Sequence, residues 1–331
     1  MKKKVIAIVL AAVMAMSVAG CGSKEKTEKQ EGKTADNKEE IVNKEASIDV
    51  PDEVTKGGEL KIALISSPKN LDPVKYTGTY EAQILYQVCD TVVTYDKEIA
   101  NIKPSLATEW TISEDGMEYL FTIRDDVYFH PGKFQDGRKM TAEDVAYSLN
   151  RSAKESALQR LDMLDYAEAV DETHVKAVLK APSAVFMTAL TNIGNGIVPK
   201  EEVEGWGDEF GNHLVGTGPF MMEKFSLDQQ TELVKNEKYF LGEPNLDRVV
   251  FKVITDQNQE VNALRTGEID IAMQISGESV KLVAEDEKIN LLKKPSIQIT
   301  YAYFNMVNGP TADPKVREAL IKAVDYKELA A

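Results

Sequence analysis

The N-terminus carries the feature that most restricts what this chain can become. Three lysines at positions 2–4 precede an almost unbroken apolar run from Val5 to Val18, 14 residues long. A helix that crosses the hydrocarbon core of a membrane needs about 20 apolar residues, so this run is too short for a good permanent span. A positive start followed by such a run is typical of a secretory signal peptide, and a short buried helix is the alternative. The sequence therefore predicts an exported chain.

The residues that close the apolar run predict a lipid anchor. The small residues Val18-Ala19-Gly20 precede Cys21, a pattern that resembles the bacterial lipobox. On that resemblance residues 1–20 are a lipoprotein signal peptide. Cleavage then leaves Cys21 as a lipid-modified N-terminus on the extracytoplasmic face of the cell membrane. Each buried methylene of an acyl chain adds about 0.8 kcal/mol to membrane affinity, so two or three chains hold the protein firmly.

Residues 21–56 are predicted to form a tether between the anchor and the globule. Between residues 23 and 49 lysine and glutamate dominate, aromatic side chains are absent, and large apolar side chains are few. Such a segment buries too little apolar surface to offset its chain entropy. We therefore expect disorder there, with a transient helix as the alternative.

Charge and cysteine content argue against a nucleic-acid partner and against an intramolecular disulfide. The formal net charge is −15 and no basic stripe is present, so we expect no nucleic-acid partner. The sequence has 2 cysteines, and because Cys21 is assigned to the lipid, Cys89 has no partner for an intramolecular disulfide. A hydrophobic core must therefore hold the globule. Roughly 270 ordered residues suffice for about two domains.

Strand and helix patterns mix along the whole globule, which predicts an α/β fold. Alternating apolar residues predict strands, and apolar residues at helical spacing predict helices. The expected strands are 59–65, 91–95, 106–112, 118–124, 173–179, 268–273, 289–293 and 297–304. The expected helices are 80–88, 256–266 and 279–286, with two more that begin after Thr141 and Asp313.

Residues that favour helix ends support three of these helices. Thr141 is a good N-cap, and Val145, Leu149, Ala153 and Ala157 follow it at core spacing. Gly267 suits the left-handed position that ends the helix 256–266. Asp313 is an N-cap with proline at the first helical position. The predicted core face of that last helix comprises Val316, Ala319, Leu320, Ala323 and Val324.

Several motifs follow one another in a fixed order. They are GGELKIAL (57–64) with NLDP (70–73), PSLATEW (104–110), YLFTIR (119–124) with His130, TAEDV (141–145), VGTGPF (215–220), NEKYF (236–240), GEIDI (267–271), YFN (303–305), VREAL (316–320) and AVD (323–325). Each motif alone is weak. Their order and spacing resemble extracellular solute-binding family 5, the oligopeptide, dipeptide and nickel-type substrate-binding lipoproteins of ABC transporters.

The resemblance implies a two-lobed α/β fold like that of the periplasmic binding proteins, of the type II or cluster C kind, with an extra strand-rich subdomain. Its lobes close on a ligand like a hinged clamp. Residues 57–92 and 185–294 would form lobe I, and 93–184 the strand-rich subdomain. Residues 295–331 would form the hinge and the start of lobe II. Because members of the family continue well past this point, we expect a C-terminally truncated chain whose second lobe is mostly missing.

The resemblance also implies a function. Such a protein captures di- or oligopeptides and delivers them to the permease and ATPase of an ABC importer, as a monomer and without a cofactor. Alternative ligands are a nickel chelate, haem or an oligosaccharide, and the alternative class is a lipid-anchored hydrolase. The sequence offers no catalytic or metal motif, because the three histidines lie far apart and neither H-E-x-x-H nor G-x-S-x-G occurs. We therefore expect no enzyme and no metal site.

Three segments supply candidate ligand-binding residues, because ligands of hinged α/β proteins bind at strand ends and loops. The first follows the opening strand, the second follows GEIDI where relatives in the family touch the peptide backbone, and the third is the expected crossing strand. The candidates are Tyr76, Thr79 and Tyr80, then Met273 and Gln274, then Gln298 and Tyr301. The alternative for each is packing within its own loop or sheet. Trp110, Tyr119, His130, Thr217 and Arg317 are interpreted as structural.

Overall fold

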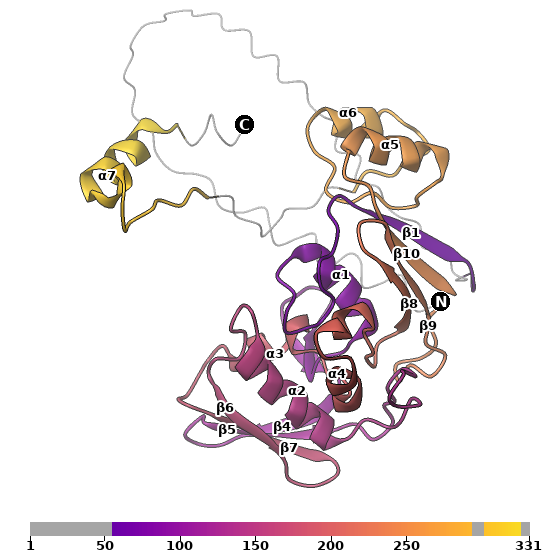
Figure 1. Cartoon of the computed structure of the whole chain (residues 1–331), viewed down its shortest axis with the longest axis vertical. Coiled ribbons are helices and arrows are strands. Elements are labelled where there is room, and N and C mark those ends of the chain that lie inside the picture. The colour runs from indigo at the N-terminus through magenta and orange to yellow at the C-terminus, as the bar shows by residue number, and fades with distance from the viewer. Residues whose placement is uncertain (1–54, 293–300, 326–331) are drawn as a thin grey trace, which may run out of the picture. The chain divides into compact units, whose positions relative to one another are not determined.

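The computed structural model describes residues 55–292 and 301–325 (Figure 1). The predicted signal peptide, Cys21, the tether up to residue 54, and Gln298 lie outside the described residues. The mixed α/β class is confirmed, because helices and strands alternate along the described part of the chain. The division into lobe I, subdomain and lobe II stays a prediction.

The first sheet joins the start of the globule to a distant segment. Its strands follow the order β1-β10-β9-β8. They are β1 (Glu59–Leu64), β8 (Phe220–Ser226), β9 (Gln230–Lys235) and β10 (Arg248–Val253). β1 pairs with β10 in parallel, and the other pairs are antiparallel. Leu64 faces one buried cluster and Ala63 another, so the end of β1 is covered on both faces.

The second sheet is antiparallel and follows the order β4-β5-β7-β6. Its strands are β4 (Ala107–Ile112), β5 (Glu118–Ile123), β6 (Leu164–Ala169) and β7 (His174–Leu179). A separate two-stranded ribbon joins β2 (Val93–Tyr95) to β3 (Ile102–Pro104). The predicted β4–β5 hairpin is confirmed, and Gly116 adopts the left-handed backbone that its turn requires.

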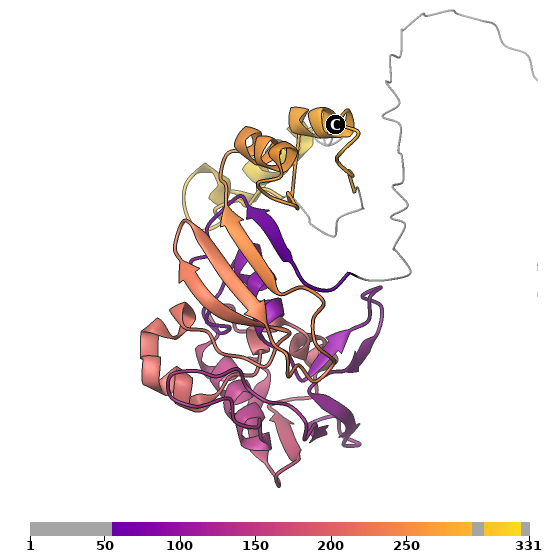
Figure 2. The same cartoon turned by 90° about the vertical axis from the view of Figure 1, so that its right-hand side faces the viewer.

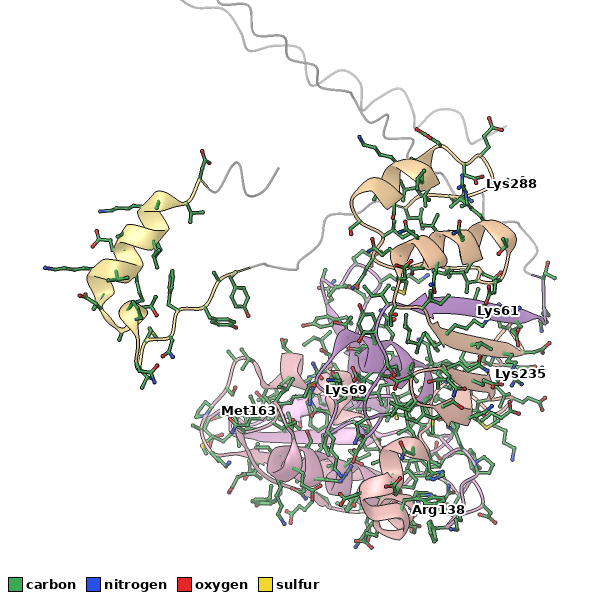
Figure 3. The ribbon with its side chains drawn as sticks, turned by 45° about the horizontal axis from the view of Figure 1, so that its top comes forward. Lys61, Lys69, Arg138, Met163, Lys235 and Lys288 are labelled. Atoms are coloured by element: carbon green, nitrogen blue, oxygen red, sulfur yellow. The ribbon has the colours of Figure 1, made fainter. Side chains whose placement is uncertain are left out.

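Helix α2 (Ala142–Glu155) packs on the second sheet and begins as predicted. Asp144 accepts hydrogen bonds from the Thr141 backbone N–H and hydroxyl, both at 2.9 Å. Arg138, which is labelled in Figure 3, forms one ion pair with Asp144 in the first turn of this helix and another with Glu201. The helix ends at Glu155, so the prediction that Ala157 belongs to its core face is wrong. The Ala157 N–H instead bonds to a loop carbonyl.

Four of the remaining helices lie close to their predicted places. They are α1 (Thr79–Val88), α5 (Gln257–Thr266), α6 (Glu278–Ala284) and α7 (Pro314–Ala323). The short helices α3 (Phe186–Leu190) and α4 (Lys200–Trp206) were not predicted, nor were the 3₁₀ turns at Ile193–Asn195, Gly207–Asn212 and Pro310–Ala312. Gly267 is left-handed behind α5, and the Asp313 side chain caps α7 as expected.

Three predicted strands are wrong over the described residues. Segment 268–273 makes a single bridge, Ile271 to Ile62, because the chain turns away at Gln274, whose backbone is left-handed. Segments 289–292 and 301–304 form no strand, since a strand needs a hydrogen-bonded neighbour and the described residues supply none. The predicted core face of α7 is also wrong, because no described residue buries that helix.

A buried ion pair ties the loop after β1 to α2. Arg151 of α2 donates two hydrogen bonds to Asp72, at 2.9 and 2.6 Å, and Asp72 is 1% exposed. The Asp72 carboxylate also accepts a hydrogen bond from the Val74 backbone N–H, which fixes the carboxylate within its own loop. The carboxylate of NLDP therefore positions the connection that leads into α1.

Breaking this ion pair should destabilise the protein far more than breaking an exposed one. Arg151→Met leaves an uncompensated buried carboxylate, which costs about 3–5 kcal/mol of unfolding free energy. Asp208→Asn is the matched control, because Lys75–Asp208 is an ion pair with a fully exposed acid and should change stability little. Urea unfolding of both variants measures the difference. Equal losses would contradict the assigned role of Asp72.

The loop 215–218 is clasped by buried polar groups. His130 Nε2 lies 2.9 Å from the Gly218 carbonyl, so Nε2 carries the proton, and Nδ1 faces the Gly216 N–H. Burial lowers the pKa of His130 to about 4, which keeps the ring neutral. A side chain at Gly216 would collide with the Val88 carbonyl, which explains the glycine.

Asp90 holds the same loop from the other side. It accepts hydrogen bonds from the Thr217 hydroxyl at 2.8 Å and the Tyr239 hydroxyl at 3.0 Å. Burial raises the pKa of Asp90 to about 6, although both hydroxyl groups oppose that rise. Ionised Asp90 is therefore a destabilising element at neutral pH.

Asp90→Asn should alter the pH dependence of stability in a defined direction. The folded protein holds this proton more tightly than the unfolded chain, so wild-type stability falls as pH rises from about 4 to about 6. The variant lacks that fall. Its stability relative to wild type should increase by on the order of 3 kcal/mol between pH 4 and pH 7. Urea unfolding across this range measures the difference, and a constant difference would contradict the assignment.

Candidate functional site

The parallel pairing of β1 and β10 defines one edge of the first sheet as a place for a ligand. Figure 2 shows these two strands side by side, with α5 and α6 above one end of the pair. Ile271 bridges Ile62 in the same parallel sense, so three chain segments leave the sheet at one edge. They lead to α1, to α5 and to the turn 272–276. In open α/β sheets, ligands bind outside the carboxyl ends of parallel strands.

Two of the predicted ligand-binding residues meet at this edge. The Tyr80 hydroxyl donates a hydrogen bond of 2.9 Å to Gln274 Oε1. Tyr80 lies in the first turn of α1, and Gln274 lies in the turn after Ile271, 194 residues away in the sequence. This contact joins the first two predicted segments into one site.

Gln274 is held in a strained and exposed position. Its φ is 61°, a left-handed value that usually costs a non-glycine residue about 1 kcal/mol or more. Its backbone carbonyl accepts a hydrogen bond of 3.4 Å from Gln257 Nε2. Since Tyr80 occupies Oε1 and no described residue occupies Nε2, the side chain offers a free N–H₂ donor pair. Such a donor suits a carbonyl or carboxylate oxygen.

Glu260 lies directly behind this pair and is fully buried, with 0% exposure. Its Oε1 accepts the Met273 N–H at 3.3 Å, and its Oε2 has no hydrogen-bond partner. Burial raises the pKa of Glu260, and the Met273 N–H opposes the rise. Burial, and next the charge of Glu260, also raise the pKa of Tyr80, so that hydroxyl remains a donor at neutral pH.

The other predicted residues lie elsewhere. Thr79 is exposed at the first position of α1, beside Tyr80. Tyr76 is 7% exposed, its hydroxyl donates to Asn192 at 2.9 Å, and Arg160 covers its ring, so it packs in the core instead of lining this edge. Tyr301 is 62% exposed and bonds to Tyr303. The binding roles of Thr79, Met273 and Tyr301 stay predictions.

Gln257 and Glu260 are site residues that sequence reasoning missed. Glu260 lies between the apolar positions of α5, next to the buried Val261 and one turn before Leu264. An acid on the buried stripe of an amphipathic helix is the signal that could have singled it out. Gln257 has no such signal, because it is a half-buried polar residue at the start of the helix.

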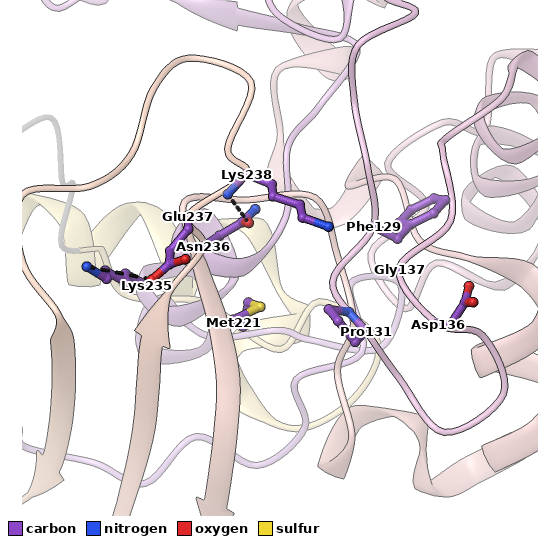
Figure 4. A pocket seen from close by; sticks show the side chains of 9 residues that line it. All are labelled: Phe129, Pro131, Asp136, Gly137, Met221, Lys235, Asn236, Glu237 and Lys238. Carbon is purple, nitrogen blue, oxygen red and sulfur yellow. Dashed lines mark hydrogen bonds and ion pairs between the residues drawn. The ribbon is translucent and has the colours of Figure 1, made fainter.

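A separate hollow of about 260 Å³ lies at the opposite edge of the sheet (Figure 4). The Phe129–Gly137 loop and the end of β9 enclose it, and Lys238 reaches across it. The register aligns Val234 with Arg248 and Arg248 with Glu59, so this end of β9 lies at the same end of the sheet as the start of β1. None of the predicted ligand residues lines the hollow, so the carboxyl edge is the better site.

Within residues 55–292 and 301–325, no group of histidine, cysteine or acidic side chains has the arrangement of a metal site. In the same part of the chain, no helix is long and apolar enough to cross a membrane.

The fold is α/β, and the edge where three chain segments meet is its candidate ligand site. Residues 101–331 match the family model "Bacterial extracellular solute-binding proteins, family 5 Middle", and the chain belongs to this family. The sequence resemblance is thereby confirmed, and with it the two-lobed type of fold that the family's solved structures share.

Two curated relatives and one solved structure illustrate the similarity. The chain is 31% identical over 279 residues to the glutathione-binding protein GsiB of Salmonella typhi, covering 82% of this chain and 53% of the relative. It is 29% identical over 286 residues to di/tripeptide-binding protein 2 of Pseudomonas aeruginosa, covering 79% and 53%. The crystal structure of NikZ from Campylobacter jejuni with Ni(L-His) matches with a TM-score of 0.72 and 28% identity, covering 82% and 54%.

The chain thus spans about half the length of the curated relatives that it matches. The prediction of a binding protein rather than an enzyme is confirmed by family membership, because both the family and the relatives are described by what they bind.

Proposed function

We propose that this chain captures small peptides outside the cell and presents them to the permease of an ABC importer. The single observation that carries the proposal is the Tyr80–Gln274 pair at the carboxyl edge of β1 and β10. A free amide N–H₂ beside an aromatic ring suits a peptide, whose carbonyl oxygens need donors and whose side chains need apolar surface. The two curated relatives, which bind glutathione and di- or tripeptides, support this ligand class.

Removing the Gln274 side chain should weaken peptide binding. One lost hydrogen bond is worth about 0.5–1.5 kcal/mol, so Gln274→Ala should bind a dipeptide or tripeptide roughly 2- to 10-fold more weakly. Gln159→Ala is the matched control, because Gln159 is also an exposed glutamine with a left-handed backbone, φ 51°, in the loop after α2. Isothermal titration calorimetry measures both affinities.

The same calorimetry tests the ligand class. A screen of di- and tripeptides, a nickel–histidine chelate, haem and an oligosaccharide should show binding of the peptides alone. The nickel chelate is the informative alternative, since NikZ holds Ni(L-His) on this fold. Binding of the chelate without any peptide would contradict the peptide proposal, and equal losses in the Gln274 and Gln159 variants would contradict the proposed site.

The lipid anchor is part of the same proposal. The apolar run followed by Cys21 supports lipidation, which would hold the protein beside its permease. Cys21→Ser should leave the protein as an unprocessed precursor or release it from the membrane. Fractionation with a mass measurement distinguishes the two. A variant that is processed and partitions with membranes like the wild type would contradict the assignment.

A further inference from the structure

The first turn of α5 contacts the chain on both sides of Gln274. Glu260 Oε1 accepts the N–H of Met273, which precedes Gln274. Gln257 Nε2 lies 3.4 Å from the Gln274 carbonyl and 3.2 Å from the Ser276 hydroxyl. Residues 257 and 260 are three positions apart and therefore lie on one face of the helix. We call these two side chains, Gln257 and Glu260, the α5 clamp.

The clamp explains how a strained residue is kept in place. A glutamine keeps a left-handed backbone only where surrounding contacts hold that backbone in place. Glu260 binds the N–H of the peptide group between Ala272 and Met273, and Gln257 binds the carbonyl of the peptide group that follows Gln274. Because α5 follows β10 directly, the clamp is fixed to the sheet edge that also positions Tyr80.

A buried carboxyl group such as that of Glu260 is unusual where a residue only stabilises the fold. It is fully buried, and its second oxygen lacks any partner. Within residues 55–292, no lysine, arginine or histidine forms an ion pair with it. The charge of Glu260 acts on Tyr80 of α1. The charged groups on the segments that adjoin α5 have partners of their own or are exposed: Arg265 with Asp286 of α6, Glu268 with Lys252, Asp270 on the Lys61 N–H, and the exposed Lys281 and Glu285 of α6. A buried carboxylate without a counter-charge is costly unless it takes up a proton.

We propose that Glu260 is a positioning residue of the ligand edge, whose buried carboxyl group holds the Met273 N–H and so fixes the backbone on which Gln274 presents its donor. The ligand part of this inference rests on the proposed function. Neutral Glu260 suits the buried position, whereas ionised Glu260 favours states in which the carboxylate reaches water and lets go of Met273. Ligand affinity therefore falls as pH rises through the pKa of Glu260, which burial places above that of an ordinary glutamate.

The Met273 amide reports on the clamp without any ligand. In the full chain labelled with ¹⁵N-methionine, the Met273 resonance should titrate with an inflection above the ordinary glutamate value of about 4.3. Glu260→Gln keeps an acceptor for the N–H but cannot ionise, so the inflection should vanish while the amide stays protected from exchange. Glu260→Ala removes the acceptor, so exchange at Met273 should be about 5- to 10-fold faster. Glu285→Gln, an exposed acid on α6, is the control and should change neither quantity.

Affinity for the dipeptide Ala-Ala completes the test. Glu260→Gln should retain wild-type affinity at low pH and lose its pH dependence, whereas Glu260→Ala should lose about as much affinity as Gln274→Ala. If the Met273 amide resonance titrates in Glu260→Gln as it does in the wild type, the α5 clamp is wrong, even if Glu260→Ala fails to fold. If Met273 titrates as expected but no variant binds the dipeptide, the backbone role of Glu260 stands and the peptide function fails.

Discussion

The parallel pairing of β1 with β10 is the contact on which the site depends. It joins residues 59–64 to residues 248–253 and aligns their carboxyl ends. The bridge from Ile62 to Ile271 adds a third segment to the same edge. Tyr80 lies far in the sequence from Gln257 and Gln274, and the three residues meet because these strand ends coincide. The geometry of the candidate site is therefore a consequence of sheet topology more than of any local motif.

Buried polar contacts fix the loops around this sheet where a disulfide-rich protein would use covalent links. Asp72–Arg151 secures the path from β1 to α1, and neutral His130 secures the loop at Gly218. Each of these contacts is nearly or fully paired, which is what burial demands of a polar group. Glu260 differs because one of its oxygens is unpaired, as is Oε1 of Gln83 on α1, and Glu260 lies beside the candidate site. Departures from full pairing are expected where function, not stability, selects the residue.

Local signals in the sequence predicted local structure well. Thr141, Asp313 and Gly267 mark helix ends because capping involves only neighbouring backbone groups. The sequence named Tyr80 and Gln274 as candidates in two separate segments, and the hydrogen bond between them is a finding of the structure. Tyr76 shows the limit of such reasoning, because its loop position gave no sign that Asn192 and Arg160 would enclose it.

Features that need a distant partner could not be predicted. The segment 268–273 alternates like a strand, yet Asp270 and Ile271 both donate to the Lys61 carbonyl and the ladder stops after one bridge. The apolar stripe of α7 predicted a helix correctly, but a stripe cannot show what covers it. For Glu260 the sequence shows only an acid on the buried stripe of α5, and its contact with Met273 and its effect on Tyr80 appear only in the structure.

A crystal structure of the protein with a bound di- or tripeptide tests the central claim most directly. The account predicts a peptide carbonyl within hydrogen-bonding distance of Gln274 Nε2, with Tyr80 still bonded to Oε1. A peptide bound in the hollow between Phe129 and Lys238, or at any place away from the carboxyl ends of β1 and β10, would contradict it.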